Sequence, residues 1–476
     1  ELNNNQIQVA VVKKNTTVLE HLRDGIKMTD PETRAKHRVL IIDDEADYAT
    51  INTGGKEELE DSTLEGMAQD DEVLDPTTHP TRTNRAVRRI LSLFEKTAYI
   101  GYTATPFANV LIDEGKTDPT LGKTLYPRNF IMSLKRPEGY FGPDTFFGNL
   151  DDPDDERQHI VEVSESKAIE VHEMQHDPDS KTDDLVPEAL QSAMMDFFLT
   201  GAVRELRRRN GRGMNPHHTM LVHVTRLSDD QQVIKELIEK LVELWKGRIT
   251  STLSDDFRNR LRLRWESQFS DSFETWSDFE EVLKDPNWLE SIEVLMINYL
   301  SKETLDYEGE PRNIIAVGGN KLSRGLTLEG LCISLFLRET KLYDSLMQMG
   351  RWFGHRHGYE DLVRVHSTPT LIQWYSWLVR VEEVVRADIK RYELYGKTPR
   401  ELSVRIPLHN PQDPSHGTMT PTSRGKMKSA ITTIVHYGGT TVQSIRLPQD
   451  QPSRLKHNLE ETTSFLNRIG EPVNPD

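Results

Sequence analysis

The chain has 476 residues and a formal net charge of −17, with 59 Lys and Arg residues against 76 Asp and Glu residues. At roughly 100–200 residues per domain, this length predicts two to four domains. Hydrophobic residues make up 36% of the sequence, which is enough for a core and excludes global disorder. The acidity argues against a uniformly basic surface for nucleic acid, although a local basic track remains compatible with it.

Two segments carry the excess of negative charge. Residues 56–75 have a net charge of −8 and residues 138–184 a net charge of −12, which leaves +3 for the rest of the chain. Both segments lack apolar periodicity, and we interpret residues 138–186 as an acidic linker.

The composition also restricts the environment of the protein. The single cysteine, Cys332, excludes an intrachain disulfide and a multi-cysteine zinc site, and its place in an apolar run predicts a buried core residue. No apolar run reaches the ~18 residues of a membrane span, and the first residues lack a signal-peptide pattern. We therefore expect a reduced, soluble, cytoplasmic protein with no membrane partner.

Short apolar strands alternate with helices over the first 137 residues. In chain order we expect a strand at residues 7–12, a helix at 16–23, and strands at 38–42 and 97–102. The strands are apolar throughout rather than alternating, a pattern typical of a parallel sheet covered on both faces by helices. Residues 1–137 are therefore predicted to be one α/β unit.

A second α/β unit is predicted over residues 187–366. Its expected strands lie at residues 220–225, 313–317, 331–337 and 361–366. Residues 226–311 are interpreted as a helical insertion between the first two of these strands. A helix from residue 368 to about residue 392, with proline in its first turn as helix starts allow, opens a carboxy-terminal extension over 367–476.

Acidic residues cluster directly after the expected strand at 38–42. They are Asp43, Asp44, Glu45 and Asp47. Their position is the carboxyl edge of a parallel sheet, where ligands bind in open α/β folds. An Asp there can hold Mg²⁺, which prefers hard oxygen ligands, and a neighbouring Glu can orient or deprotonate an attacking water.

Three later patterns are also candidates for ligand contact. Thr103 and Thr105 follow the next strand, where their hydroxyls can hydrogen-bond the acids of the neighbouring strand. Residues 318–329 join two buried strands and include Gly325, which permits a tight backbone. Residues 348–359 contain two arginines and several glycines near a helix end, and guanidinium groups match phosphate geometry.

In this order the patterns resemble motifs II, III, V and VI of superfamily-2 helicases. They read Asp44-Glu-Ala-Asp47, Thr103-Ala-Thr-Pro106, Ser323-Arg-Gly-Leu-Thr327 and Gln348-Met-Gly-Arg351 followed by Arg356. Residues 350–362 resemble more narrowly the bacterial Z1 domain family, helicase-like proteins often described as endonucleases and linked to restriction and phage-defence gene sets. The helicase motifs cover about residues 1–366, and the Z1 resemblance covers most of residues 187–440.

The resemblance implies an α/β fold of two RecA-like lobes with parallel sheets. The first lobe, at residues 1–137, would carry motifs Ia, II and III and would be incomplete. The second lobe, at residues 187–366, would carry motifs IV, V and VI together with the helical insertion. The extension at 367–476 would belong to the Z1 domain family.

The resemblance also implies roles for single residues. Asp44 and Glu45 would be the catalytic, Mg²⁺-linked acids, with Asp43 as the alternative for the first role. Arg351 and Arg356 would be arginine fingers that complete the ATP site when the lobes close. The remaining residues of the ATP site would be Asp47, Thr103, Thr105, Arg324, Gly325, Thr327 and Gln348.

Several residues are candidates for contact with nucleic acid. Lys13, Lys14, Asn15 and Thr225 fall where motifs Ia and IV would lie. Arg208 belongs to a basic cluster at a helix end, for which phosphate contact and interaction with the helix dipole both remain open. Arg424 and Lys426 are further candidates for phosphate contact.

The sequence departs from the helicase pattern in two places. Arg351 and Arg356 are five residues apart rather than the usual three, which leaves open which of them reaches the γ-phosphate. No Gly-x-x-x-x-Gly-Lys-Ser/Thr loop occurs, although a phosphate cradle needs such a loop before a helix. We therefore expect a fragment that lacks the amino-terminal part of its first lobe and binds nucleotide poorly or not at all.

Three functions remain open at this point. The favoured one is an ATP-driven DNA motor of a bacterial restriction or phage-defence system, with ATP and Mg²⁺ as cofactors and other defence subunits as partners. A Mg²⁺-dependent endonuclease would need a carboxylate cluster outside the helicase motifs, and the sequence offers only short matches. A non-catalytic scaffold with a degenerate motor fold would account for the missing phosphate loop.

Overall fold

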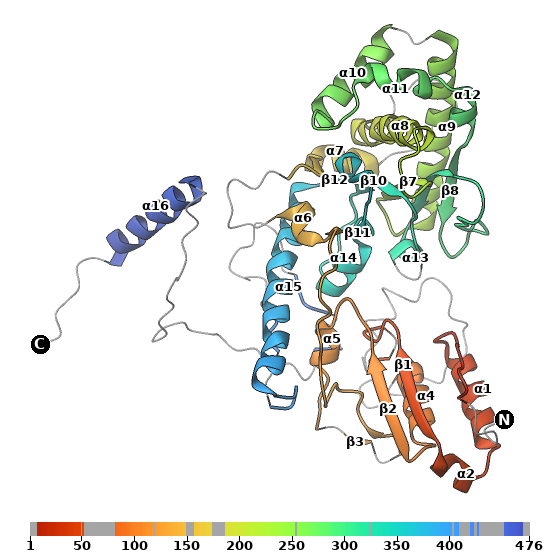
Figure 1. Cartoon of the computed structure of the whole chain (residues 1–476), viewed down its shortest axis with the longest axis vertical. Coiled ribbons are helices and arrows are strands. Elements are labelled where there is room, and N and C mark those ends of the chain that lie inside the picture. Colours follow the sequence, from red (N-terminus) through yellow and green to blue (C-terminus); the bar gives the residue numbers. More distant parts are fainter. Residues whose placement is uncertain are drawn as a thin grey trace, which may run out of the picture.

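The computed structural model describes residues 7–48, 50–51, 81–115, 117–118, 120–148, 157–173, 186–252, 255–323, 326–401, 404–408, 419–422, 426–427 and 452–469. These residues form a mixed α/β protein with a two-stranded and a six-stranded parallel sheet. The two-stranded sheet lies in the lower part of Figure 1 and the six-stranded sheet above it. We call the described residues within 7–125 the small-sheet unit and those within 140–401 the large-sheet unit.

The small-sheet unit pairs β1 (Arg38–Asp43) with β2 (Lys96–Gly101) in parallel. Helices α1 (Thr16–Lys27) and α4 (Arg82–Leu91) pack against one face, around a core of Leu19, Ala86, Val87 and Ile90. On β1, the side chains of Leu40 and Ile42 are 55% and 62% exposed. Among the described residues, the sheet is therefore covered on one face rather than on both as expected.

The first predicted strand is wrong. Residues 7–12 form no strand, and their side chains are exposed. The predicted helix that follows is present as α1, with Asn15 as its N-cap. A strand is stable only beside a neighbour that accepts its backbone hydrogen bonds, and no described strand lies beside residues 7–12.

The six-stranded sheet is the frame of the large-sheet unit. Its four predicted strands are present, each shifted by at most a few residues. In spatial order the sheet consists of β6 (Ile160–Glu162), β12 (Arg364–Ser367), β10 (Leu331–Phe336), β7 (His218–His223), β9 (Asn313–Gly318) and β8 (Ile292–Ile297). The central strands β7 and β10 are buried along their whole length, as their continuous apolar sequences predict.

Helices cover this sheet. The residues in the middle of α8 (Glu188–Arg209) are almost all fully buried. In Figure 1, α8 lies between the sheet and the helices α10 (Asp255–Gln268) and α11 (Trp276–Leu283) at the top. Helix α9 (Ser228–Thr252) packs directly against β8 and β9, and α12 (Pro286–Glu290) packs against α9. The aromatic residues of these helices, including Trp245, Trp265 and Trp288, belong to one core with the sheet.

Two of the sheet strands lie where none was expected. Strand β6 and helix α7 (Glu165–His172) fall inside the predicted acidic linker, and β6 pairs with β12. Helix α6 (Pro143–Phe147) also lies there, with Phe146 and Phe147 fully buried. The described part of 138–186 is therefore built into the large-sheet unit. Strand β8 lies inside the predicted helical insertion and forms the edge of the sheet.

Two helices of the large-sheet unit face the small-sheet unit. The short helix α14 (Tyr343–Met349) follows β10, and the long helix α15 (Pro369–Tyr395) runs down the side of the molecule in Figure 1. Helix α5 (Phe107–Val110) of the small-sheet unit meets α14, where the rings of Phe107 and Tyr343 make an edge contact at 6.0 Å between centroids.

The remaining described elements are short or peripheral. They are α2 (Pro31–Lys36), β3 (Thr117–Asp118), β4 (Gly122–Lys123), β5 (Tyr140–Phe141), α13 (Asn320–Ser323), β11 (Gly354–His355), the 3-10 helix at Glu360–Leu362 and α16 (Pro452–Ile469). Within the described residues, no helix combines the length and apolar character that a membrane crossing requires.

Candidate functional site

The carboxyl ends of β1 and β2 bring two of the predicted motifs together. The strands are in register from Arg38 opposite Lys96 to Asp43 opposite Gly101, so the loops that follow them begin side by side. A Cβ atom at Gly101 would lie 2.8 Å from the Cβ atom of Ala46. Glycine at this position therefore permits the close approach of the two loops.

The buried carboxylate of Asp47 is the centre of the site. This residue is 0% exposed. Its two oxygens accept hydrogen bonds from the hydroxyls of Thr103 at 2.8 Å and Thr105 at 2.9 Å. The expectation that these threonines reach the acids of the neighbouring strand is confirmed, and the acid they reach is the last of the four.

Gln348 joins this centre from the large-sheet unit. Its side-chain Nε2 atom donates to Asp47 Oδ2 at 2.7 Å and to Thr105 Oγ1 at 2.8 Å. Gln348 lies in α14, and 301 residues separate it from Asp47 in the chain. Residues of the predicted motifs II, III and VI therefore meet at one buried carboxylate. We call Asp47, Thr103, Thr105 and Gln348 the Asp47 network.

We call the segment 43–47, which carries the four predicted acids, the acidic loop. A lysine side chain binds it. The ammonium group of Lys14 donates to Asp43 Oδ1 at 2.9 Å and to the backbone carbonyls of Asp44 at 2.7 Å and Glu45 at 2.6 Å. The hydroxyl of Tyr99 donates to the second oxygen of Asp43 at 2.6 Å. Burial and the negative charge of Asp43 raise the pKa of Tyr99, so this phenol remains a donor.

The contact with nucleic acid predicted for Lys14 stays a prediction. In the structure its ammonium group is hydrogen-bonded to three oxygens of the acidic loop. Asp43 is 6% exposed, and a buried carboxylate is stable when it is paired and hydrogen-bonded. Asp44, by contrast, is exposed, and one of its carboxylate oxygens accepts from the backbone N–H of Glu45 at 3.0 Å.

Glu45 has an unusual backbone conformation. Its φ angle is +50°, and it is the one non-glycine residue with positive φ among the described residues. Such a conformation costs on the order of 1–3 kcal/mol and occurs often at functional sites. The negative charge of Glu45 acts on Arg351 of the large-sheet unit, where it raises the pKa of the guanidinium group against the lowering effect of burial.

Arg351 approaches the acidic loop from the end of α14. Burial lowers the pKa of its guanidinium group, the charge of Glu45 opposes this effect, and the nearby Arg356 adds to it. The group also donates a hydrogen bond to the backbone carbonyl of Leu326. An arginine remains charged under these conditions, so Arg351 brings positive charge to the predicted catalytic acids.

Arg356 does not share this position. It is 7% exposed, and its Nη2 atom donates to the backbone carbonyl of Trp352 at 2.8 Å and to that of Arg351 at 3.2 Å. Its Nη1 atom donates to the carbonyl of His355 at 3.0 Å. The guanidinium group of Arg356 therefore holds the turn after α14 together, whereas that of Arg351 donates to Leu326 and is influenced by the charge of Glu45.

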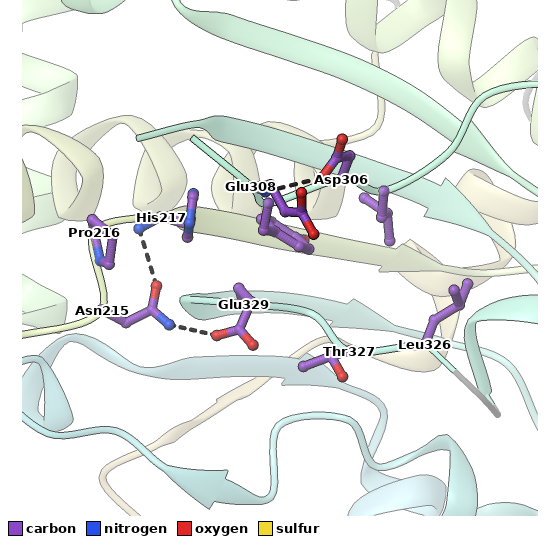
Figure 2. Close-up of a pocket in the computed structure, with 10 residues that line it drawn as sticks. Asn215, Pro216, His217, Asp306, Glu308, Leu326, Thr327 and Glu329 are labelled. Atoms are coloured by element: carbon purple, nitrogen blue, oxygen red, sulfur yellow. Dashed lines mark hydrogen bonds between the residues drawn. The ribbon is translucent and has the colours of Figure 1, made fainter. Parts of the chain in front are cut away.

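Thr327 belongs to the wall of a pocket in the large-sheet unit. It is exposed and lines an open pocket of about 490 Å³ together with Asn215, His217, Tyr307 and Glu329. Figure 2 shows this pocket, in which the side-chain amide of Asn215 points to Glu329. Its walls come from segments that precede β7, β9 and β10, so the pocket is at the amino edge of the sheet.

The other predicted nucleic-acid residues mostly have structural partners. The side-chain oxygen of Asn15 caps α1, and the Thr225 hydroxyl donates to Asp230 at 3.0 Å near the start of α9. Arg208 pairs with Glu205 at 2.7 Å. Lys13 is exposed, and Lys426 is discussed below. Arg324, Gly325 and Arg424 lie outside the described residues.

A comparison with known families can now be added to this geometry. Residues 189–412 match the family model described as the Z1 domain. The matched range contains β7 to β12, α14 and Arg351, whereas the acidic loop and the two threonines lie before it. Over residues 189–412 the chain is thus similar to the Z1 domain family, a range that lies within the 187–440 of the sequence resemblance. No curated protein and no solved structure matches the chain.

Proposed function

We propose that the protein is an ATP-driven, helicase-like motor that acts on DNA in a bacterial restriction or phage-defence system. ATP and Mg²⁺ are its cofactors in this proposal, and other subunits of the system are its partners. The observation that carries the proposal is the Asp47 network, because residues from three predicted motifs meet there at one buried carboxylate.

The Asp47 network supplies the mechanical connection that a motor needs between its two parts. In such proteins a small change at the nucleotide has to move one rigid part against another. The Asp47 network connects the loop that carries Asp44 and Glu45 with α14 of the large-sheet unit. A shift of this loop changes the hydrogen bonds at Gln348, and α14 carries that change into the large-sheet unit.

In this proposal the magnesium ion binds at the acidic loop. Three of its oxygens already accept hydrogen bonds from one cationic group, the ammonium of Lys14, and the carboxylate of Asp44 is exposed. Asp44 and Glu45 are the residues that would hold the ion. When bound, Mg²⁺ neutralises charge on phosphate oxygens. In this proposal Glu45 orients the attacking water, and Arg351 supplies positive charge from the other unit.

The sequence does not provide the other half of an ATP site. Phosphates bind to the backbone N–H groups of a glycine-rich loop before a helix, and the Gly-x-x-x-x-Gly-Lys-Ser/Thr pattern is absent from these 476 residues. The residues present therefore do not fit the whole nucleotide. We assign no phosphate cradle to them, and the test below uses the full-length gene product.

The decisive experiment measures ATP hydrolysis by the full-length gene product with and without DNA. We expect hydrolysis that DNA stimulates and that Glu45→Gln reduces by about 100-fold or more, as loss of a group that activates water does. Glu32→Gln is the matched control, because Glu32 is an exposed acid in the first turn of α2 and has no role in this proposal.

The same assay separates the alternative functions. DNA cleavage that requires Mg²⁺ but not ATP, and that survives Glu45→Gln, would support the endonuclease. DNA binding by a wild-type protein that hydrolyses no ATP would support the scaffold. A gene that encodes no Gly-Lys-Ser/Thr loop upstream of Glu1 would contradict the ATPase directly.

A further inference from the structure

A segment from later in the chain caps the helix that carries Gln348. The first backbone N–H groups of a helix have no acceptor within it, and Leu342, which precedes α14, has no side chain that can cap it. Instead, the N–H groups of Tyr343 and Asp344 donate to the carbonyls of Thr420 at 2.9 Å and Pro421 at 3.4 Å. The Thr420 N–H donates in turn to the carbonyl of Lys341 at 2.8 Å.

The same segment also binds the first acid of α14. Asp344 is 2% exposed, and Thr422 is 0% exposed. The Thr422 hydroxyl donates to Asp344 Oδ2 at 2.7 Å, and the ammonium group of Lys426 lies 4.0 Å from the same oxygen. The Lys426 side chain is 8% exposed and lies in this internal ion pair, and its contact with nucleic-acid phosphate stays a prediction.

Asp344 and Gln348 lie on the same face of α14. They are four residues apart, which places them slightly more than one helical turn, or ~6 Å, from each other along the helix. At one end of this face Asp344 meets Thr422 and Lys426, and at the other end Gln348 meets Asp47 and Thr105. Because one helical turn joins them, a displacement of Asp344 also moves Gln348.

Helix α14 depends on such contacts for its position. It has seven residues, and helices of that length are not stable without tertiary contacts. Helix α15 holds its other side, where the Tyr375 hydroxyl donates to the carbonyl of Leu346 at 2.7 Å and the Trp377 indole donates to the Tyr343 hydroxyl at 2.9 Å.

We propose that Thr422 and Lys426 are positioning residues that hold α14, through Asp344, where Gln348 reaches the Asp47 network. Both lie after the range 189–412 that matches the Z1 domain. The consequence for ATP hydrolysis rests on the proposed function, whereas the positioning of α14 does not. The two parts are therefore tested by different measurements.

The first measurement is hydrogen exchange of the backbone amides of residues 343–349 in the whole chain. Thr422→Val removes the hydroxyl and keeps the shape, and the loss of a buried hydrogen bond to a carboxylate should speed this exchange about tenfold. Thr422→Ser restores the hydroxyl and should return the exchange to within about twofold of wild type. Unchanged exchange in Thr422→Val would overturn the proposal.

Thr420→Val is the matched control. It makes the same chemical change in the same segment, but the Thr420 hydroxyl contacts the carbonyl of Thr422 rather than Asp344. We expect no faster exchange over 343–349 in this variant. If Thr422→Val does not fold, Lys426→Met carries the same comparison, because it removes the more distant partner of Asp344, and unchanged exchange there would overturn the proposal as well.

The second measurement is ATP hydrolysis by the full-length gene product. Thr422→Val should lower kcat about tenfold and leave KM for ATP within about twofold, because it misplaces Gln348 without touching the nucleotide. In a Gln348→Ala background it should have no further effect, and a fully additive loss would contradict the route through Gln348. If the wild type hydrolyses no ATP, the proposed function fails, and the exchange measurement alone decides the positioning of α14.

Discussion

The small-sheet unit and the large-sheet unit differ in how much of their apolar surface is buried. The small-sheet unit packs α1 and α4 around four buried residues and leaves Leu40 and Ile42 exposed on the other face of its sheet. The large-sheet unit encloses six strands and many aromatic rings in one core. Since a two-stranded sheet is marginal alone, the unit with the predicted catalytic acids depends on its neighbours for its position.

The largest expected effect on stability comes from a substitution in the core of the large-sheet unit. Phe198 is 0% exposed, and its ring contacts Trp245 and Trp288. We expect Phe198→Ala to lower the free energy of unfolding by about 3–5 kcal/mol, as measured by urea denaturation followed by tryptophan fluorescence.

A substitution in the small-sheet unit tests whether this unit opens independently of the large-sheet unit. Ile90 is 4% exposed in its core, and Ile90→Ala should speed hydrogen exchange over β1 and β2 while the main unfolding transition stays near the wild-type denaturant concentration. An equal shift of that transition by both substitutions would show that the two units unfold as one.

The second effect is a loss of stability of the large-sheet unit at acid pH. His218, His223 and His366 are buried in the large-sheet unit, and burial lowers the pKa of each, that of His223 to about 3. Because these groups regain a pKa near 6.5 on unfolding, the unfolded state binds more protons below that pH. Stability should therefore fall as the pH drops below ~6.5 towards the folded-state pKa values, by up to about 1.4 kcal/mol per pH unit for His223.

This acid dependence should distinguish the two units. Its measurement is urea denaturation between pH 7 and pH 5, and His223→Gln should reduce the slope against pH by about one proton. Exchange protection over β1 and β2 should change less in that range, since the buried histidines among the described residues all lie in the large-sheet unit. A slope that His223→Gln leaves unchanged would assign the acid sensitivity to other groups.

The third effect separates the two units from each other. Asp47→Ala removes an acceptor that serves two threonines and Gln348, of which Thr105 is buried. We expect a loss of about 2 kcal/mol in the contact between the units, measured as faster proteolysis of the small-sheet unit. Combined with Gln348→Ala, the losses should be less than additive, whereas additive losses would mean that the two residues act separately.

The smallest effect concerns the acidic loop. Lys14→Met should destabilise the small-sheet unit by about 1 kcal/mol, because Asp43 loses its ion pair and the carbonyls of Asp44 and Glu45 lose a donor. Added Mg²⁺ should raise the melting temperature of this variant more than that of wild type. Lys13→Met, at the exposed neighbouring position, is the control, and an equal response to Mg²⁺ in all three proteins would refute competition at these oxygens.

The sequence predicts the parts of the fold that depend on local pattern. Continuous apolar runs predict β7, β9 and β10, and polar residues at strand ends predict that Asp47, Thr103 and Thr105 meet, because parallel strands share a carboxyl edge. The burial of Cys332, which is 1% exposed, follows in the same way from its apolar neighbours.

The parts that were missed depend on distant partners. Strands β6 and β8 stand in acidic and helical surroundings, and only their pairing with β12 and β9 identifies them. The predicted strand at 7–12 is wrong for the converse reason, because its sequence is apolar but no described strand lies beside it. Lys14 and Lys426 have the charge expected of phosphate contacts, but their anionic partners lie 29 residues away at Asp43 and across the fold at Asp344.

The burial of Cys332 has a practical consequence. Its thiol donates to the carbonyl of Leu362 in the core, and burial raises its pKa, so the native chain should react slowly with maleimide dyes. Cysteines introduced at exposed positions, such as Glu32→Cys in α2 and Glu281→Cys in α11, can then be labelled selectively without deletion of the natural one. Energy transfer between two such dyes would follow the separation of the two units in a single molecule.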